Sequence, residues 1–244
     1  MSALPGIWHT LSSSAATAHL PWLTLTLAAY LAAMALYRRS GNHPLLIPVF
    51  TAVAAVVGVL LATGTPYASY RSGVSLLGML IGPATVALAI PLYAQRARIR
   101  ALWLPISVAL AVGCVVALLS ALAIGWALGG SAQTLAALAP KSATIPIALP
   151  MAERFGGPAS LAAVAVAITG ISGTMMAPWL IRLVRSKDPA VQGFALGLTA
   201  HAIGTARALQ MDPAMGAFSA LAMGLNGVAT AVAMPLCMAL LPWF

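Results

Sequence analysis

The stretch LAPKSATIPIALP, residues 138–150, places a lysine and two hydroxyl side chains among three prolines in an otherwise apolar region. Pro140 and Pro146 each interrupt a helix, because proline lacks the backbone N–H and clashes with the preceding turn. A broken helix exposes a helix N-terminus, which attracts negative charge as the ammonium of Lys141 does. The pattern predicts an anion site formed by Lys141, Ser142 and Thr144. The alternative places Lys141 at a helix end, extending its ammonium to water at the membrane surface.

A second stretch, TAHAIGTARAL at residues 199–209, carries a histidine and an arginine. His201 and Thr205 share one face of a helix, because they are four residues apart. Arg207 follows them, and the three side chains are candidates to line a substrate site. His201 also has an ordinary pKa suited to proton coupling. The alternative makes His201 a hydrogen-bonded packing residue between helices and Arg207 an anchor at the membrane interface.

Two further polar residues complete the candidate substrate-binding set. Asn226 lies in the sequence GLNG, where an interhelical hydrogen bond is the competing interpretation. Thr85 lies in ATVALAIP, which matches ATIPIALP at residues 143–150 in four of eight positions. This echo places Thr85 at the position of Thr144. It is either an internal repeat of the kind that transporters contain or a coincidence in an alanine-rich chain.

Composition determines which elements can position these residues. The chain has 244 residues, of which 61% are hydrophobic and only 6% are charged. This composition lies outside the range of water-soluble domains and predicts an integral membrane protein. The net charge of +9 comes from arginines and lysines at the ends of apolar runs. Such residues set the orientation of membrane spans, so we expect no nucleic-acid partner.

We predict an all-α polytopic membrane protein that forms one domain over residues 1–244, with about six transmembrane helices and two broken or re-entrant segments. Each span needs about 20 apolar residues. The expected spans are approximately residues 20–37, 44–62, 74–93, 101–128, 158–183 and 215–241. The weaker segments are Ser131 to Arg154 and Pro189 to Gln210, which are rich in small residues. The amino terminus has no basic region before its first apolar run, so we expect it to be retained.

The positions of the basic clusters test whether the two weaker segments are re-entrant or cross the membrane. The clusters lie at residues 38–39, 96–100 and 182–187, and the positive-inside rule puts all three in the cytoplasm. They share one side only if residues 131–154 enter and leave the membrane at the outer face. Residues 189–210 would then enter from the cytoplasm. If either segment is instead a broken spanning helix, one cluster lies on the wrong side.

The scarcity of acidic residues excludes several kinds of chemistry. The chain contains three acids, Glu153, Asp188 and Asp212, and all three lie at predicted segment ends. A cation site built on a carboxylate in the middle of the membrane is therefore not expected. The chain offers neither a catalytic triad nor a carboxylate pair, and it has no acid-containing ligand set for a metal. We therefore expect no enzymatic activity, no metal and no cofactor.

Four motifs in order give the chain a resemblance to the LrgB/CidB family of bacterial membrane proteins. They are GPATVALAIPLY, PKSATIPIA, AHAIGTARAL and GAFSALAMGLNG, and the similarity spans residues 20–241. This family also resembles the carboxy-terminal half of the plant plastidial glycolate/glycerate translocator. The resemblance implies a multi-pass protein of the bacterial inner membrane. Ile145 departs from the family, which usually has a second threonine there, so the polar lining of the site is reduced.

The resemblance implies two competing functions. One is transport of small monocarboxylates such as glycolate, glycerate, lactate or pyruvate. The other is an antiholin-like role, in which the protein acts with a small LrgA/CidA-like membrane subunit to control murein hydrolase export and autolysis. We favour a transporter of small organic anions working by alternating access, because the few polar residues concentrate in two helix-breaking motifs. The alternative is a regulatory subunit that binds no substrate. The sequence leaves homo-oligomerisation open.

Overall fold

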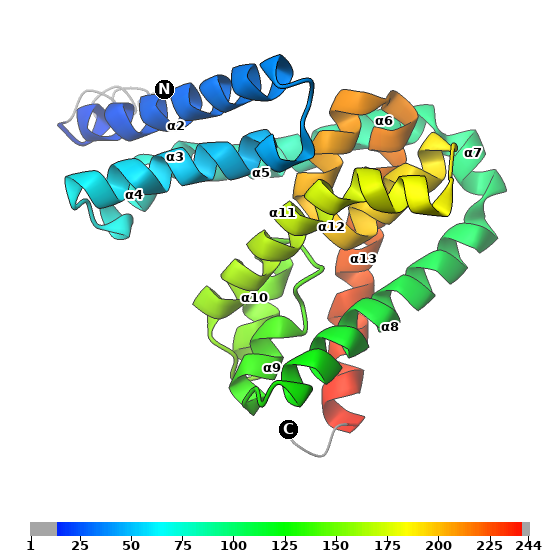
Figure 1. Ribbon diagram of the computed structural model, residues 1–244. Helices are drawn as coiled ribbons and strands as arrows, with labels where there is room; N and C mark the ends of the chain where they lie inside the picture. Colours follow the sequence, from blue (N-terminus) through cyan, green and yellow to red (C-terminus); the bar gives the residue numbers. More distant parts are fainter. Residues whose placement is uncertain (1–13, 241–244) are drawn as a thin grey trace, which may run out of the picture. The chain divides into compact units, whose positions relative to one another are not determined.

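The computed structural model describes residues 14–240, with side chains from Leu20 onward. These residues form helices joined by short connections, and no strand occurs among them. They divide into two compact units, separated in the sequence between Ala87 and Leu88. The predicted all-α membrane fold class is confirmed, and Figure 1 shows its helices. The amino terminus expected to be retained includes residues 1–13, which lie outside the described residues.

In the first unit, the short helix α4 contacts the long helix α2. Its elements are α2 (Ser14–Arg39), the 3-10 helix η1 (Pro44–Leu46), α3 (Pro48–Thr63), α4 (Tyr67–Gly73) and α5 (Ser75–Ala87). The ring of Trp22 in α2 meets Tyr70 in α4 edge to face. The hydroxyl groups of Thr26 and Tyr70 lie 3.0 Å apart and share a hydrogen bond. These contacts join α2 to α4 and close the unit.

The second unit contains both segments with weak hydrophobicity. Its elements are α6 (Ala89–Ala94), α7 (Arg96–Ala101), α8 (Trp103–Ala127), α9 (Ala132–Leu138), α10 (Ile145–Arg154), α11 (Ala159–Val184), α12 (Pro189–Met211) and α13 (Pro213–Leu240). The longest helices are α8, α11 and α13, and the shorter helices α9, α10 and α12 pack among them (Figure 1).

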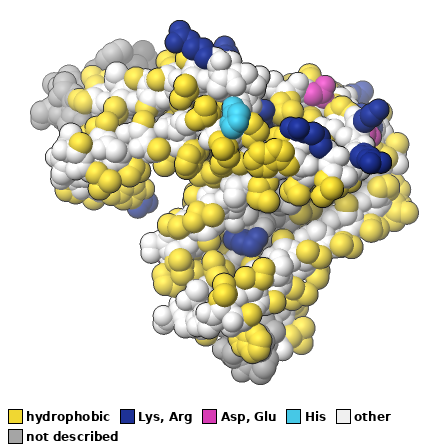
Figure 2. All heavy atoms as spheres, viewed as in Figure 1, with side chains coloured by type: hydrophobic (Ala, Val, Ile, Leu, Met, Phe, Trp, Pro, Cys, Tyr) yellow, Lys and Arg dark blue, Asp and Glu magenta, His cyan; other side chains and the backbone are white. Residues whose placement is uncertain are grey.

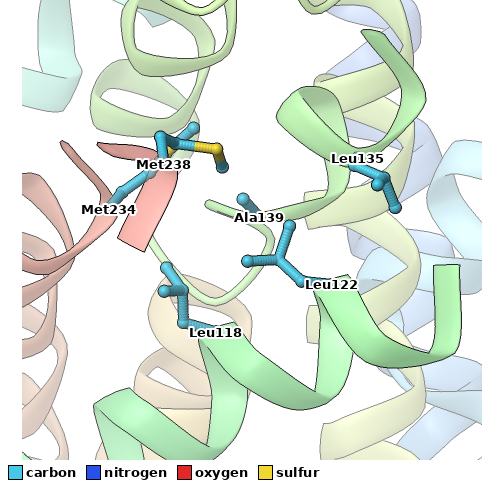
Figure 3. Close-up of a cluster of buried hydrophobic side chains, with 6 residues drawn as sticks. All are labelled: Leu118, Leu122, Leu135, Ala139, Met234 and Met238. Carbon is cyan, nitrogen blue, oxygen red and sulfur yellow. The ribbon is translucent and has the colours of Figure 1, made fainter. Parts of the chain in front are cut away.

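A buried hydrophobic cluster joins three of these helices. Figure 3 shows it, and its members come from α8, from α9 with the residue after it, and from α13: Leu118, Leu122, Leu135, Ala139, Met234 and Met238. Burying a large apolar side chain contributes about 1.5–3 kcal/mol relative to leaving it exposed. The cluster therefore fixes α9 between two long helices, although α9 has only seven residues.

The α9 and α10 helices form a hairpin. Ala137 near the end of α9 packs with Ala152 near the end of α10. Ala143, between the helices, packs with Ala148 near the start of α10. Because the early residues of α10 lie near the turn and its late residues lie back beside α9, the chain reverses between the two helices. The sequence prediction of a broken element at residues 131–154 is therefore confirmed.

The α12 helix also reverses direction, although its hydrogen bonding continues across the turn. Gly197 and Thr205 both lie against Ser219 of α13. Leu196 and Gly204 are also in close approach, since a methyl group on Gly204 would stand 2.7 Å from the Leu196 carbonyl oxygen. Residues eight positions apart in a straight helix are separated by about 12 Å. The two halves of α12 are therefore folded against each other as a second hairpin.

An ion pair relates two of the basic clusters. Arg98 of α7 contacts Asp188 at the start of α12, with 2.7 Å between Nη2 and Oδ1. Asp188 follows the cluster at residues 182–187 directly, so both clusters lie at one end of the second unit. Figure 2 shows basic side chains gathered over this end, where α7 and the end of α11 lie. For these two clusters the placement agrees with the positive-inside rule, and the third cluster, at residues 38–39, belongs to the first unit.

Five candidate spans are long and apolar enough to cross a membrane by length and composition. They are Leu20–Arg39, Ser75–Ala94, Trp103–Ala127, Ala159–Val184 and Pro213–Leu240. The remaining expected span, residues 44–62, corresponds to α3, which has 16 residues. Since a span needs about 20 residues, α3 is shorter than the sequence suggested.

Candidate functional site

The turn between α9 and α10 is formed by backbone hydrogen bonds around a proline. The N–H of Lys141 donates to the Leu138 carbonyl at 3.1 Å, and the N–H of Ala143 donates to the Pro140 carbonyl at 2.9 Å. Thr144 directly precedes α10, and its side chain makes no capping hydrogen bond. The turn therefore leaves the half-buried hydroxyl of Thr144 uncommitted at the start of α10, whose first two residues are exposed.

The turn within α12 occurs at His201, whose backbone angles are φ 39° and ψ −128°. A positive φ is unfavourable for a residue with a Cβ and costs about 1–3 kcal/mol. The imidazole is 3% exposed, and its Nε2 donates to the Val166 carbonyl of α11 at 3.0 Å. The hydroxyl of Thr205 donates to the His201 carbonyl at 2.8 Å. His201 therefore faces the interior of the unit, and its role in a substrate site stays a prediction.

Asn226 of α13 joins the two turns. Its Nδ2 donates to the Ser142 carbonyl at 3.0 Å and to the Leu198 carbonyl at 3.3 Å. The two turns therefore meet in the protein interior. The side chain is 1% exposed, and its Oδ1 has no hydrogen-bond partner among the described residues. A buried acceptor without a partner costs about 1–3 kcal/mol and is a feature often associated with function.

A cavity of about 480 Å³ adjoins the first turn, and its lining includes two of the three residues of the predicted anion site but not Thr144. Lys141 and Ser142 line it together with residues of α8, α11 and α12. The ammonium of Lys141 donates to the Ser142 hydroxyl at 3.4 Å. Lys141 is only half-buried, so its charge is available to the cavity. The volume lies within the range of small-molecule sites, which is about 300–1,000 Å³.

Three hydroxyl residues of the cavity were not identified from the sequence. Thr169 and Ser172 of α11 and Thr199 of α12 line it. Ser172 donates to the Ile168 carbonyl, and Thr199 donates to that of Ala195. Residues 169, 172, 173 and 176 share a face at helical spacing, which was the available signal.

The remaining predicted residues lie in different places. Thr205 is buried, and its hydroxyl lies 3.0 Å from that of Ser219. Arg207 is half-buried on the second half of α12. Neither residue lines the cavity. Thr85 belongs to the first unit, where its exposed hydroxyl donates to the Ile81 carbonyl of its own helix.

Comparison with known proteins shows what kind of membrane protein this is. Residues 26–240 match the LrgB-like family. The chain therefore belongs to the LrgB-like family, and it is a multi-pass membrane protein. The resemblance drawn from the four motifs is confirmed. No solved structure matches the chain.

Among relatives, the uncharacterized protein YxaC of Bacillus subtilis is 37% identical over 84% of this chain and 89% of its own length. The uncharacterized protein YwbG of the same organism is 35% identical, covering 87% of this chain and 94% of its own. The antiholin-like protein LrgB of Bacillus cereus is 28% identical, with coverage of 88% and 94%.

Proposed function

We propose that this protein is a carrier of small organic anions in the bacterial inner membrane, working by alternating access and without enzymatic activity. The observation that carries the proposal is the meeting of two helical hairpins at Asn226. Broken helices that meet near the middle of the membrane are a recurring way to build a transport site, because their exposed backbone groups are tolerated only around a cavity.

The charge of the cavity favours an anion. Lys141 contributes a positive charge, and the cavity lining contains no acidic residue among the described part of the chain. The hydroxyl groups of Ser142 and Thr169 can donate to a carboxylate, as can that of Thr199 once it rotates away from the Ala195 carbonyl. Most of the remaining lining is apolar. A small carboxylate with a short apolar body, such as a monocarboxylate, fits this combination.

A second function is favoured by a relative's name. The Bacillus cereus relative is called antiholin-like, which fits a regulatory membrane subunit better than a carrier. Under this proposal the chain would act with a small LrgA-like membrane subunit and would control autolysis without binding a substrate. The hairpins and the bridge at Asn226 would then stabilise the fold alone.

Uptake by purified protein in liposomes separates the two functions. We expect saturable uptake of labelled glycolate, lactate or pyruvate. Replacing Lys141 by Met keeps the side-chain length and removes the charge, so the affinity for the anion should fall by about 1.5–3 kcal/mol, the value of a hydrogen bond to a charged group. Arg154→Gln, at the exposed end of α10 and outside the cavity lining, is the matched control and should leave uptake unchanged.

Two results would contradict the carrier proposal. One is the absence of saturable uptake of any tested monocarboxylate by folded protein. The other is wild-type affinity in the Lys141→Met variant at equal reconstitution. If uptake is absent and co-expression with a small LrgA-like subunit changes the rate of lysis, the regulatory function is supported instead.

A further inference from the structure

An apolar groove runs between α8 and the first half of α12, separate from the body of the candidate cavity. Its volume is about 380 Å³. Ile106, Ala109 and Gly113 form its wall on α8, at the spacing of one helix face. Val191, Phe194 and Leu198 face them from α12. The groove therefore offers an elongated apolar surface with two helical walls.

The length of the groove matches one leaflet of a bilayer. Its lining extends along α8 from Leu102, the residue before the helix, to Gly113, and along α12 from Asp188, the residue before that helix, to Thr199. Eleven residues of helix extend about 16 Å. The hydrocarbon core of a bilayer is about 30 Å thick, so this length is close to one half of it. An acyl chain entering at Asp188 would end at the level of Thr199.

The mouth of the groove is strongly basic. Asp188 lines this end, and the ion pair with Arg98 offsets its charge. The ion pair brings the two basic clusters together at this end, and their other basic side chains are exposed: Arg96, Arg100, Arg182, Arg185 and Lys187. No unpaired carboxylate accompanies them in the described part of these clusters. The mouth is therefore complementary to an anionic group at the level of lipid headgroups.

We propose that the groove binds one phospholipid with an anionic headgroup, such as phosphatidylglycerol. The headgroup contacts the basic mouth, and one acyl chain lies between α8 and α12. Anionic headgroups attract basic side chains near a membrane surface by about 1 kcal/mol for each charge, which corresponds to about fivefold in affinity. The apolar groove selects a lipid over a free phosphate, because only the lipid carries a chain to fill it.

The bound chain would contact the part of α12 that leads to His201. Gly113, Leu198 and Thr199 line both the groove and the candidate cavity. A lipid seated there stabilises the packing of the first half of α12 against α8. The lipid site is independent of the proposed transport, since either function of the chain leaves the groove and its basic mouth in place.

Native mass spectrometry of the full-length protein tests this site. The protein, released from detergent, is titrated with phosphatidylglycerol or phosphatidylcholine, and the dissociation constant of the first bound lipid is measured. We expect phosphatidylglycerol to bind at least about fivefold more tightly. The double variant Arg100→Gln/Lys187→Gln should reduce this preference to near one. Arg154→Gln makes the same kind of charge change on α10 and should leave it unchanged.

A groove-filling variant separates a seated lipid from a lipid attracted only by surface charge. Val191 is 54% exposed, so Val191→Trp should fold and fill the groove. Loss of the tight phosphatidylglycerol adduct in this variant supports the proposal. Three results overturn it: equal binding of both lipids by the wild type, full preference in Val191→Trp, or an equal loss of preference in Arg154→Gln. Thermal unfolding of each variant confirms that it is folded before binding is compared.

Discussion

The two hairpins of the second unit reverse the chain by different means. The α9 helix ends at Leu138, and six residues, Ala139 to Thr144 with Pro140 among them, separate it from α10. Within α12 the reversal takes place at His201 alone, and no proline stands there. The first turn follows from a residue that cannot continue a regular helix. The second is imposed on a residue that would adopt ordinary helical angles elsewhere.

This difference indicates which contacts stabilise each turn. The Pro140 turn is local, because its backbone bonds lie within residues 138–143. The His201 turn depends on distant partners, namely Val166 of α11 and Ser219 of α13 through Thr205. Strained backbone persists only where surrounding contacts determine it. A histidine in this position is therefore a stronger indication of function than a glycine would be.

The largest effect is expected where both turns share a residue. Replacing Asn226 by Leu leaves the Ser142 and Leu198 carbonyls without their donor, while it removes the unpaired Oδ1. The free energy of unfolding should fall by about 2 kcal/mol, since these terms partly offset each other. Thermal unfolding in detergent measures the change. Asn226→Asp keeps the shape and removes the amide donor, so it should also destabilise; wild-type stability in both variants would disprove the bridge.

An intermediate effect should distinguish the strained turn from the relaxed one. His201→Gly and His201→Ala both remove the hydrogen bond to Val166, but only glycine adopts a positive φ without strain. The free energy of unfolding of the glycine variant should be about 1–2 kcal/mol higher than that of the alanine variant. Ala202→Gly, one residue later in the helix, should instead destabilise by about 1 kcal/mol. Equal stability of the two variants at position 201 would refute strain at this residue.

The smallest effect is expected at the local turn. Replacing Pro140 by Ala restores an N–H and increases the freedom of the unfolded chain, so stability should change by less than about 1 kcal/mol. The hydrogen bonds from Asn226 and Ala143 still hold the turn. Chemical denaturation of the reconstituted protein would measure this change. A loss larger than that of Asn226→Leu would reverse the ranking of the two turns.

The first hairpin could be predicted from the sequence because proline acts through its own covalent structure. The second was predicted only as a segment between residues 189 and 210, from charge placement and small residues. The turn at His201 was beyond prediction, since a positive φ at a non-glycine residue arises from packing with helices distant in sequence. Lys141 and Ser142 were identified as candidates because they lie beside the prolines that predict this turn.

The hydroxyl residues on the α11 side of the cavity were not predicted, for a different reason. Thr169 and Ser172 lie in a stretch of small residues, and a hydroxyl at helical spacing serves helix packing as readily as it lines a cavity. The face they present becomes clear only when α12 is placed beside α11. The position of Thr85 in the first unit likewise follows from the division of the chain, which the short echo with residues 143–150 did not indicate.

The bridge at Asn226 also has a consequence for inheritance. It contacts the main-chain oxygens of residues 142 and 198, and every amino acid carries the same oxygen. A substitution at either position therefore keeps the acceptor that the bridge needs, as long as the new side chain fits its surroundings. The bridge requires a particular side chain only at residue 226, so its constraint on the gene falls on that one codon.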